Sequence, residues 1–426
     1  MNSSTTTQGI PQHDPSLSIL KAIGILFVVI AHSGGPSWLV NTAYMFCVPL
    51  FFLCSGYLFK YSYLRHASLY LWRRLRGLYL PFWGWSVLFL VLHNFFFWIG
   101  ILSEKVGNAA GGVLHPYSWH DFCQRVWSVT FNMSGYDEFL SGSYWFFRTL
   151  FVSSLAFLGL FILLRKLTGW RNKSAVVLLI VGIAWCLAFW QVGGNLRITG
   201  LAQGGYRELI AIGFIGVGYL YRRHERFLPL PWLWAILGFV VFGLFAYFSP
   251  SAMVYKANYT QFFSLPLPAI GIFIGLLFLS RLCVQHASLL TRGLVYIGDR
   301  TLYIFAFHLL AFKLVSIVKV LVYNLDWAHV GSHTVVHVHP HDYFFLLYIL
   351  VGVGLPLLVK HFWMKMDASY NLTWWNCLVY TFKGFRWCVV LLYRGIAWIL
   401  SVCWRSLLNF KRDMSEFWKA SNPKDE

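Results

Sequence analysis

The sequence predicts an all-α polytopic membrane protein with about ten transmembrane helices, and three observations lead to that prediction. Of the 426 residues, 58% are hydrophobic and only 12% are charged, which is too apolar for the surface of a soluble protein. Apolar runs of about 20 residues recur along the chain, and this is the length that crosses the hydrocarbon core of a bilayer. Tryptophans and tyrosines gather near the ends of these runs, as in the aromatic belts of membrane proteins.

Three regions follow one another along the chain. Residues 1–16 are polar and lack the basic start of a secretory signal, so we expect a tail followed by a retained first helix. Residues 17–365 form the predicted membrane domain. Its expected spans are 17–37, 40–59, 78–101, 143–164, 175–191, 208–221, 231–248, 262–280, 295–321 and 342–363. Residues 366–426 mix aromatic and basic side chains, which favours an amphipathic helix on the inner membrane surface; an eleventh span is the alternative.

The distribution of lysine and arginine predicts the orientation. The chain has 34 of these cations against 15 acidic residues, a net charge of +19. Alternate loops and the C-terminal region hold 25 of the cations, and the opposite loops hold only Lys105, Arg125, Arg197, Arg207 and Lys256. The positive-inside rule then places both termini in the cytoplasm, and we expect a bacterial cytoplasmic (inner) membrane. The excess charge indicates contact with membrane lipid and no nucleic-acid partner.

Ionisable residues within the spans are candidate site residues, because burying them in lipid is costly. The histidines among them are His32, His93 and His308, and the cations are Lys21, Arg148, Lys313 and Lys319. Glu208 and Asp299 lie only at span edges, and no acidic residue lies mid-span. Buried cations without acidic partners favour an anionic ligand, such as a phosphate-rich cofactor, over a proton relay through carboxylates. We expect Lys313 and Lys319 to extend towards the outer membrane surface.

Lys21 and His32 share one face of the first predicted helix. They are eleven residues apart, which brings them about 20° past three full turns and roughly 16 Å apart along the axis. This places a cation near the cytoplasmic entrance and a proton acceptor deeper in the membrane. The separation is comparable to the length of the pantetheine arm of coenzyme A. The alternative is that Lys21 extends to the interface and His32 caps the helix end.

A histidine-rich segment, 327–341, lies before the last span. It contains His329, His333, His337, His339 and His341, but no regular element would present them together and no cysteine accompanies them. The eight cysteines of the chain form no Cys-x-x-Cys pair. We therefore expect neither a metal site nor a disulfide framework, and interpret the segment as a pH-sensitive outer loop.

Several short motifs, in order, resemble the acyltransferase 3 family of integral membrane acyltransferases. They are Lys21-x10-His32; Phe51-Phe52-x-x-Ser55-Gly56; Arg73-Arg74-x-Arg76 before Pro81; Tyr144-Trp145-Phe146-Phe147; and the run from Gly298-Asp299-Arg300 to His308. Lysine at position 21 is similar to the branch related to fucose 4-O-acetylases. The sequence departs from that branch at Ser18, where an acidic residue is common, and at Cys47, where a histidine is common.

The resemblance implies an acyltransferase that uses acetyl-CoA as its acyl donor, requires no metal and acts on a carbohydrate or glycolipid acceptor. It implies that His32 is a general base and that Lys21 supports catalysis and donor binding. The donor would also contact Ser55, Gly56, Arg73, Arg74 and Arg76. The acceptor would contact Tyr144, Trp145, Arg148 and His308. For Arg148, an interfacial arginine paired with lipid phosphate is the alternative.

Two other functions remain open from the sequence. The buried cations would also suit a transporter or flippase for an anionic lipid-linked substrate. A different family of membrane acyltransferases, with His308 as its base, is the third hypothesis. The ordered motifs and the lack of carboxylates within the membrane favour O-acetylation of a cell-envelope or extracellular carbohydrate.

Overall fold

The computed structural model describes residues 14–106, 115–194, 196–286 and 288–370, with side chains to residue 365. The described residues form helices and connecting loops without a β-strand. Nine of their helices are long and apolar enough to cross a membrane. The predicted class, an all-α polytopic membrane protein, is therefore confirmed.

The long helices follow the predicted spans closely. They are α1 (Pro15–His32), α2 (Ser37–Tyr57), α4 (Leu80–Trp98), α7 (Trp145–Thr168), α8 (Lys173–Gly193), α9 (Tyr206–His224), α10 (Pro231–Phe248), α12 (Pro266–Gln285), α14 (Thr301–Val322) and α15 (Phe344–Tyr370). The shorter ones are α3 (Ala67–Arg74), α5 (Trp119–Asn132), α6 (Glu138–Ser141), α11 (Tyr259–Ser264) and α13 (Leu289–Gly298). A π-helical turn, η2 (Leu75–Tyr79), joins α3 to α4.

Two predicted spans differ from the structure. Helix α9 runs over 19 residues instead of the 14 expected, but charged residues at both of its ends keep it out of the nine apolar candidates. The single span expected at 295–321 is divided, because Asp299 and Arg300 separate α13 from α14. Nearly all of the predicted surface helix at 366–426 lies outside the described residues.

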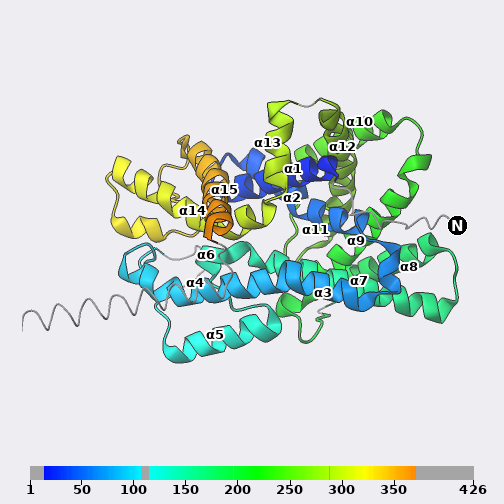
Figure 1. Cartoon of the computed structure of the whole chain (residues 1–426), viewed down its shortest axis with the longest axis horizontal. Coiled ribbons are helices and arrows are strands. Elements are labelled where there is room, and N and C mark those ends of the chain that lie inside the picture. The colour runs from blue at the N-terminus through cyan, green and yellow to red at the C-terminus, as the bar shows by residue number, and fades with distance from the viewer. Residues whose placement is uncertain (1–13, 107–114, 195, 287, 371–426) are drawn as a thin grey trace, which may run out of the picture. The chain divides into compact units, whose positions relative to one another are not determined.

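Helix α1 lies at the centre of the first structural unit, which ends at Leu358. It packs against α2, α12, α13 and α14, and α2 in turn packs against α9 (Figure 1). The contact between α2 and α9 is close at Gly56, because a Cβ atom there would overlap the backbone carbonyl of Ile215. This packing explains the glycine of the Ser55-Gly56 pair and fixes the depth of α2 beside α1.

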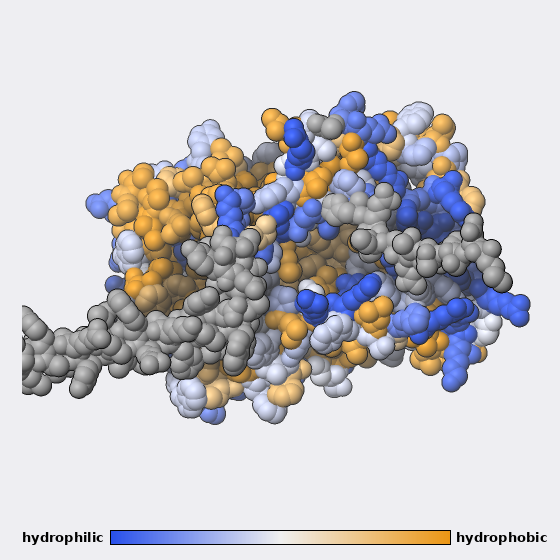
Figure 2. Space-filling view, viewed as in Figure 1, coloured by the Kyte–Doolittle hydropathy of each residue, from blue (hydrophilic) through white to orange (hydrophobic). Residues whose placement is uncertain are grey.

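The surface of this unit is largely apolar, as a lipid-facing surface should be. Figure 2 shows broad apolar areas over α14 and hydrophilic side chains gathered where α7 and α8 meet. Helix α10 exposes Trp232, Trp234, Ile236, Val240 and Leu244 among other large apolar side chains. Residues of α1, α2, α7 and α9 lie inside this apolar exterior, and they line the polar site.

Candidate active site

His32 is the last residue of α1, and its surroundings define its tautomer. Its Nδ1 lies 2.8 Å from the backbone carbonyl oxygen of Val28. A carbonyl can only accept, so Nδ1 carries the proton and donates it. Nε2 then keeps its lone pair and is free to accept a proton from another molecule. The side chain is partly exposed, because it borders two cavities.

His308 on α14 lies beside His32, with 5.3 Å between the ring centroids. Its Nδ1 donates to the carbonyl of Phe305 at 2.9 Å and also approaches that of Ile304 at 3.1 Å. The side chain is fully buried, and its Nε2 has no hydrogen-bond partner among the described residues. A buried nitrogen without a partner is costly, so this atom is expected to bind a group that enters the site.

A cavity of about 350 Å³ opens beside His32. Its polar and aromatic lining includes His32, Tyr44, Cys47, Ser143, Trp145 and Arg207. A second cavity of about 300 Å³ also borders His32 and reaches Thr334 and His337 of the histidine-rich segment. His32 therefore lines two spaces that are open to small groups.

Lys21 lies in the N-terminal half of α1, eleven residues before His32. It makes no hydrogen bond to any described residue and interacts electrostatically with Cys54 of α2. Arg74 reaches the same part of α2, where its Nη2 donates to Ser55 Oγ at 2.7 Å and to Tyr70 OH at 2.8 Å. Lys21, Ser55 and Arg74 are thus brought to one region.

The other predicted donor contacts do not join this group. Arg73 is exposed and donates to Tyr63 OH at 2.7 Å. Arg76 is also exposed, on the π-helical turn. Gly56 is buried against α9. Only Arg74 of the three arginines turns towards α2, because the helix rotates its neighbours away by about 100° per residue.

The predicted acceptor contacts separate into two kinds. Trp145 lines the cavity beside His32. Tyr144 is fully buried outside it and donates its hydroxyl to the Ala306 carbonyl at 3.1 Å. Arg148 is also buried, and its Nε donates to Glu208 Oε1 at 3.0 Å. The alternative of an interfacial Arg148 paired with lipid is therefore wrong.

The expectation that the membrane cations lack acidic partners is also wrong. Besides Arg148 with Glu208, Lys319 pairs with Asp342 at 2.8 Å. Lys313 and Lys319 do not extend to the surface, because both are buried and donate to backbone carbonyls of the segment from Val330 to His339. These acidic residues and carbonyls belong to helix ends and loops. The positions of the spans along the sequence do not show that these parts meet.

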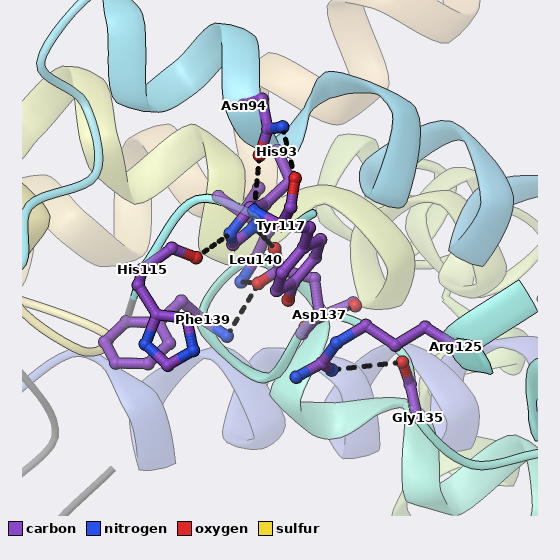
Figure 3. A network of polar contacts seen from close by, with 10 residues as sticks. His93, Asn94, His115, Tyr117, Arg125, Gly135, Asp137, Phe139 and Leu140 are labelled. Atoms are coloured by element: carbon purple, nitrogen blue, oxygen red, sulfur yellow. Dashed lines mark hydrogen bonds and ion pairs between the residues drawn. The ribbon is translucent and has the colours of Figure 1, made fainter. Parts of the chain in front are cut away.

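His93 belongs to a separate polar network (Figure 3). Its Nδ1 contacts the buried carboxylate of Asp137, and its Nε2 lies 3.0 Å from the His115 carbonyl. Both ring nitrogens are therefore engaged by oxygen atoms of the protein, and this network holds the imidazole in one orientation. The ring stacks on Tyr117 at 3.6 Å, and Arg125 covers Tyr117. Asp137 also caps α6, the short helix before the cavity residues Ser143 and Trp145.

Sequence reasoning missed Tyr44, Arg207 and Asp137. Tyr44 carried no signal, since a tyrosine in an apolar helix is commonplace. The sequence analysis places Arg207 among the loop cations, although it directly precedes Glu208 at the start of a predicted span. Asp137 precedes a predicted span, where an acidic helix cap is a recognisable signal.

The histidine-rich segment forms no metal site in the part of the chain that the structure describes. There, no group of three or more histidine, cysteine or acidic side chains is arranged to hold an ion. His333 instead contacts the ring of Phe139, and His337 borders the cavity next to His32. Burial, with the nearby Lys313 charge, lowers the pKa of His333 from 6.5 to about 4.

These features define a helical membrane protein in which the rings of His32 and His308 lie next to each other beside a cavity. The cations Lys21 and Arg74 gather further towards the N-terminus of α1, near Ser55. The chain belongs to the acyltransferase 3 family, whose acyltransferase domain matches residues 14–360. It is therefore a multi-pass membrane acyltransferase. In the other two comparisons, no curated protein and no solved structure matches the chain.

Proposed function

We propose that the protein transfers an acetyl group from acetyl-CoA to a hydroxyl of a cell-envelope or extracellular carbohydrate. One observation carries this proposal. His32 holds its Nδ1 proton on the Val28 carbonyl, which leaves Nε2 as the proton acceptor, and the residue lines a cavity of about 350 Å³. A general base in this position typically contributes about 10²- to 10⁴-fold in rate.

The arrangement along α1 supports the choice of donor. Coenzyme A has its phosphates at one end and its thioester at the other. Lys21 and Arg74 provide positive charge near Ser55, and His32 lies roughly 16 Å further along the helix axis. Charge-assisted hydrogen bonds at the cationic end would bind phosphate and direct the thioester towards His32. The charge distribution of the loops supports a donor end on the cytoplasmic side.

The reaction follows from these positions. His32 Nε2 takes the proton of the acceptor hydroxyl while the hydroxyl oxygen attacks the thioester carbonyl. The C–S bond breaks, the ester forms on the sugar, and the proton passes from His32 to the departing thiolate. His308 Nε2, the buried nitrogen without a partner among the described residues, is available to hold a second polar group of the reacting pair.

Mass spectrometry of the native glycan, from cells with and without the protein, tests this function. We expect each acceptor unit to lose the mass of one acetyl group in the absence of the protein. An unmodified but mislocalised glycan would instead support a transporter or flippase. The ion pairs of Arg148 and Lys319 weaken that alternative, because two of the four cations that suggested it already have acidic partners. Membership of the acyltransferase 3 family removes the hypothesis of a different acyltransferase family.

A further inference from the structure

Arg207 lines the same cavity as His32, and its side chain is held in place by neighbours that leave part of it free. Its guanidinium lies 3.7 Å from the ring centroid of Trp145. Nε donates to the Met253 carbonyl at 3.1 Å, and Nη1 donates to Gln203 Oε1 at 3.0 Å. Nη2 makes no hydrogen bond to any described residue. A rigid arginine with a free donor is the usual means of binding a carboxylate or phosphate.

The nearest carboxylate does not neutralise Arg207. Glu208 follows it directly, but Glu208 Oε1 accepts from Arg148 Nε and from Thr149 Oγ1, each at 3.0 Å. The Arg148–Glu208 pair is internally balanced and only 3% exposed on each side. Arg148 Nη2 is itself buried without a partner in the described part of the chain. Arg148 and Arg207 therefore share the single carboxylate of Glu208. One positive charge beside His32 is left without an acidic partner among the described residues.

A further cavity of about 480 Å³, lined by other cations, lies next to residues that contact Arg207. Gln203 and Tyr255, which both contact Arg207, line this cavity together with Arg197 and Lys256. Its lining, over the described residues, contains no aspartate or glutamate.

Five cations lie on the sparsely charged loops, and three of them, Arg197, Arg207 and Lys256, line the two cavities. The other two are engaged elsewhere, since Lys105 pairs with Asp326 at 3.9 Å and Arg125 lies over Tyr117. A lipid-binding arginine would extend outwards on a flexible side chain. Arg207 instead has four contacts, with Trp145, Met253, Gln203 and Tyr255, that hold its guanidinium beside the cavity.

We propose that the acceptor is an anionic saccharide. Arg207 binds a carboxylate or phosphate on the sugar unit whose hydroxyl faces His32, and Arg197 with Lys256 bind the anionic group of the neighbouring unit. This inference rests on the proposed carbohydrate acylation and adds the chemical class of the acceptor.

Binding without acyl donor tests the inference separately from the reaction. Equilibrium dialysis of the full-length protein in detergent would use a labelled trimer of galacturonic acid, the same trimer reduced to neutral galactose, and a polyprenyl-phosphate-linked neutral sugar. We expect one anionic probe to bind at least about tenfold more tightly than the neutral trimer, with affinity falling as salt rises. Preference for the first probe identifies a carboxylate as the recognised group, and preference for the third identifies a phosphate. Equal affinity for all three would overturn the inference.

Variants locate the binding. Arg207→Gln should weaken anionic binding by about tenfold or more, and Arg207→Lys should restore part of it. Lys105→Gln, an exposed cation outside both cavities, is the control and should bind as the wild type does. If Arg207→Gln fails to fold, the double variant Arg197→Gln/Lys256→Gln serves instead. It should weaken binding of the galacturonic acid trimer but not of monomeric galacturonic acid, and an equal loss for both would contradict the two-unit arrangement.

Transfer of acetyl from acetyl-CoA to the same probes is then measured. Anionic binding without transfer to any probe would sustain the inference about the ligand and count against acetyl transfer to saccharides of this class. Transfer to neutral and anionic trimers at equal kcat/KM would sustain the proposed function and overturn the inference. The two ideas therefore fail under different results.

Discussion

His93 and His32 are both histidines of predicted apolar helices, yet their surroundings are opposite. His93 is fully buried, its two nitrogens contact Asp137 and the His115 carbonyl, and its ring face is covered by Tyr117. His32 donates from Nδ1 only, its Nε2 makes no hydrogen bond to a described residue, and the side chain borders two cavities. A histidine whose hydrogen-bonding capacity is used up stabilises the fold. One that keeps a lone pair beside a cavity can perform chemistry.

The largest expected effect comes from His32. His32→Ala should reduce acyl transfer by about 10²- to 10⁴-fold, because the general base is lost while the helix and the donor end remain. Transfer by purified, folded protein is the measurement, together with acyl-CoA binding, which should be retained. His120→Ala, an exposed histidine on α5, is the control and should leave both unchanged. Wild-type turnover by the His32 variant would remove His32 as the base.

The second effect concerns the His93 network and is one of stability. Asp137→Asn breaks the buried contact between His93 and the Asp137 carboxylate, which should lower the free energy of unfolding by about 3–5 kcal/mol. Thermal unfolding in detergent would measure it, and activity should fall only as far as the folded fraction falls. Asp121→Asn, in the capping box of α5, is the matched control and should unfold at nearly the same temperature as the wild type. Full stability with lost activity would instead make the network part of the active site.

The third effect tests the other end of α1. Lys21→Ala should weaken acyl-CoA binding by about 1.5–3 kcal/mol, the usual contribution of a charged hydrogen bond. Lys21→Arg keeps the charge and should retain substantial activity. A short acyl thioester without the nucleotide should be affected less than acyl-CoA. Equal losses with both donors would place Lys21 near the chemistry rather than at the phosphates.

The smallest effect concerns His333, which lies between the two regions. Its pKa of about 4 in the folded protein, against 6.5 for the free side chain, results first from burial and then from the charge of Lys313. His32 and His337 act in the same direction, and Asp137 opposes them. His333 binds a proton more readily in the unfolded chain than in the folded protein. The stability that depends on a neutral His333 is therefore fully present above pH 6.5. It is lost as the pH falls towards 4.

The free energy of unfolding falls between pH 7 and pH 5, in part because of His333. In His333→Gln this fall should be smaller than in the wild type by about 1–2 kcal/mol. Thermal unfolding at both pH values, compared with the wild type, measures the difference. An unchanged difference between the two pH values would show that His333 does not titrate in this interval.

The periodicity of α1 accounts for how much of the site could be predicted. Placing Lys21 and His32 on one face needs only the helical repeat, so both positions were accessible from the sequence. Arg73, Arg74 and Arg76 show the limit of that reasoning. Their spacing identifies a basic cluster, but the rotation of α3 and the π-helical turn after it decide that only Arg74 reaches Ser55.

Composition, apolar run length and the order of the motifs determined the membrane fold, the family and the position of His32 by themselves, because these properties depend on residues close together in the chain. The partners of the buried charges were decided only in three dimensions. Glu208 lies 60 residues after Arg148, and Asp137 lies 44 residues after His93. Local periodicity carries no information about which helix ends meet. Burial nevertheless demands that each such charge find a partner, and helix packing alone selects which one it finds.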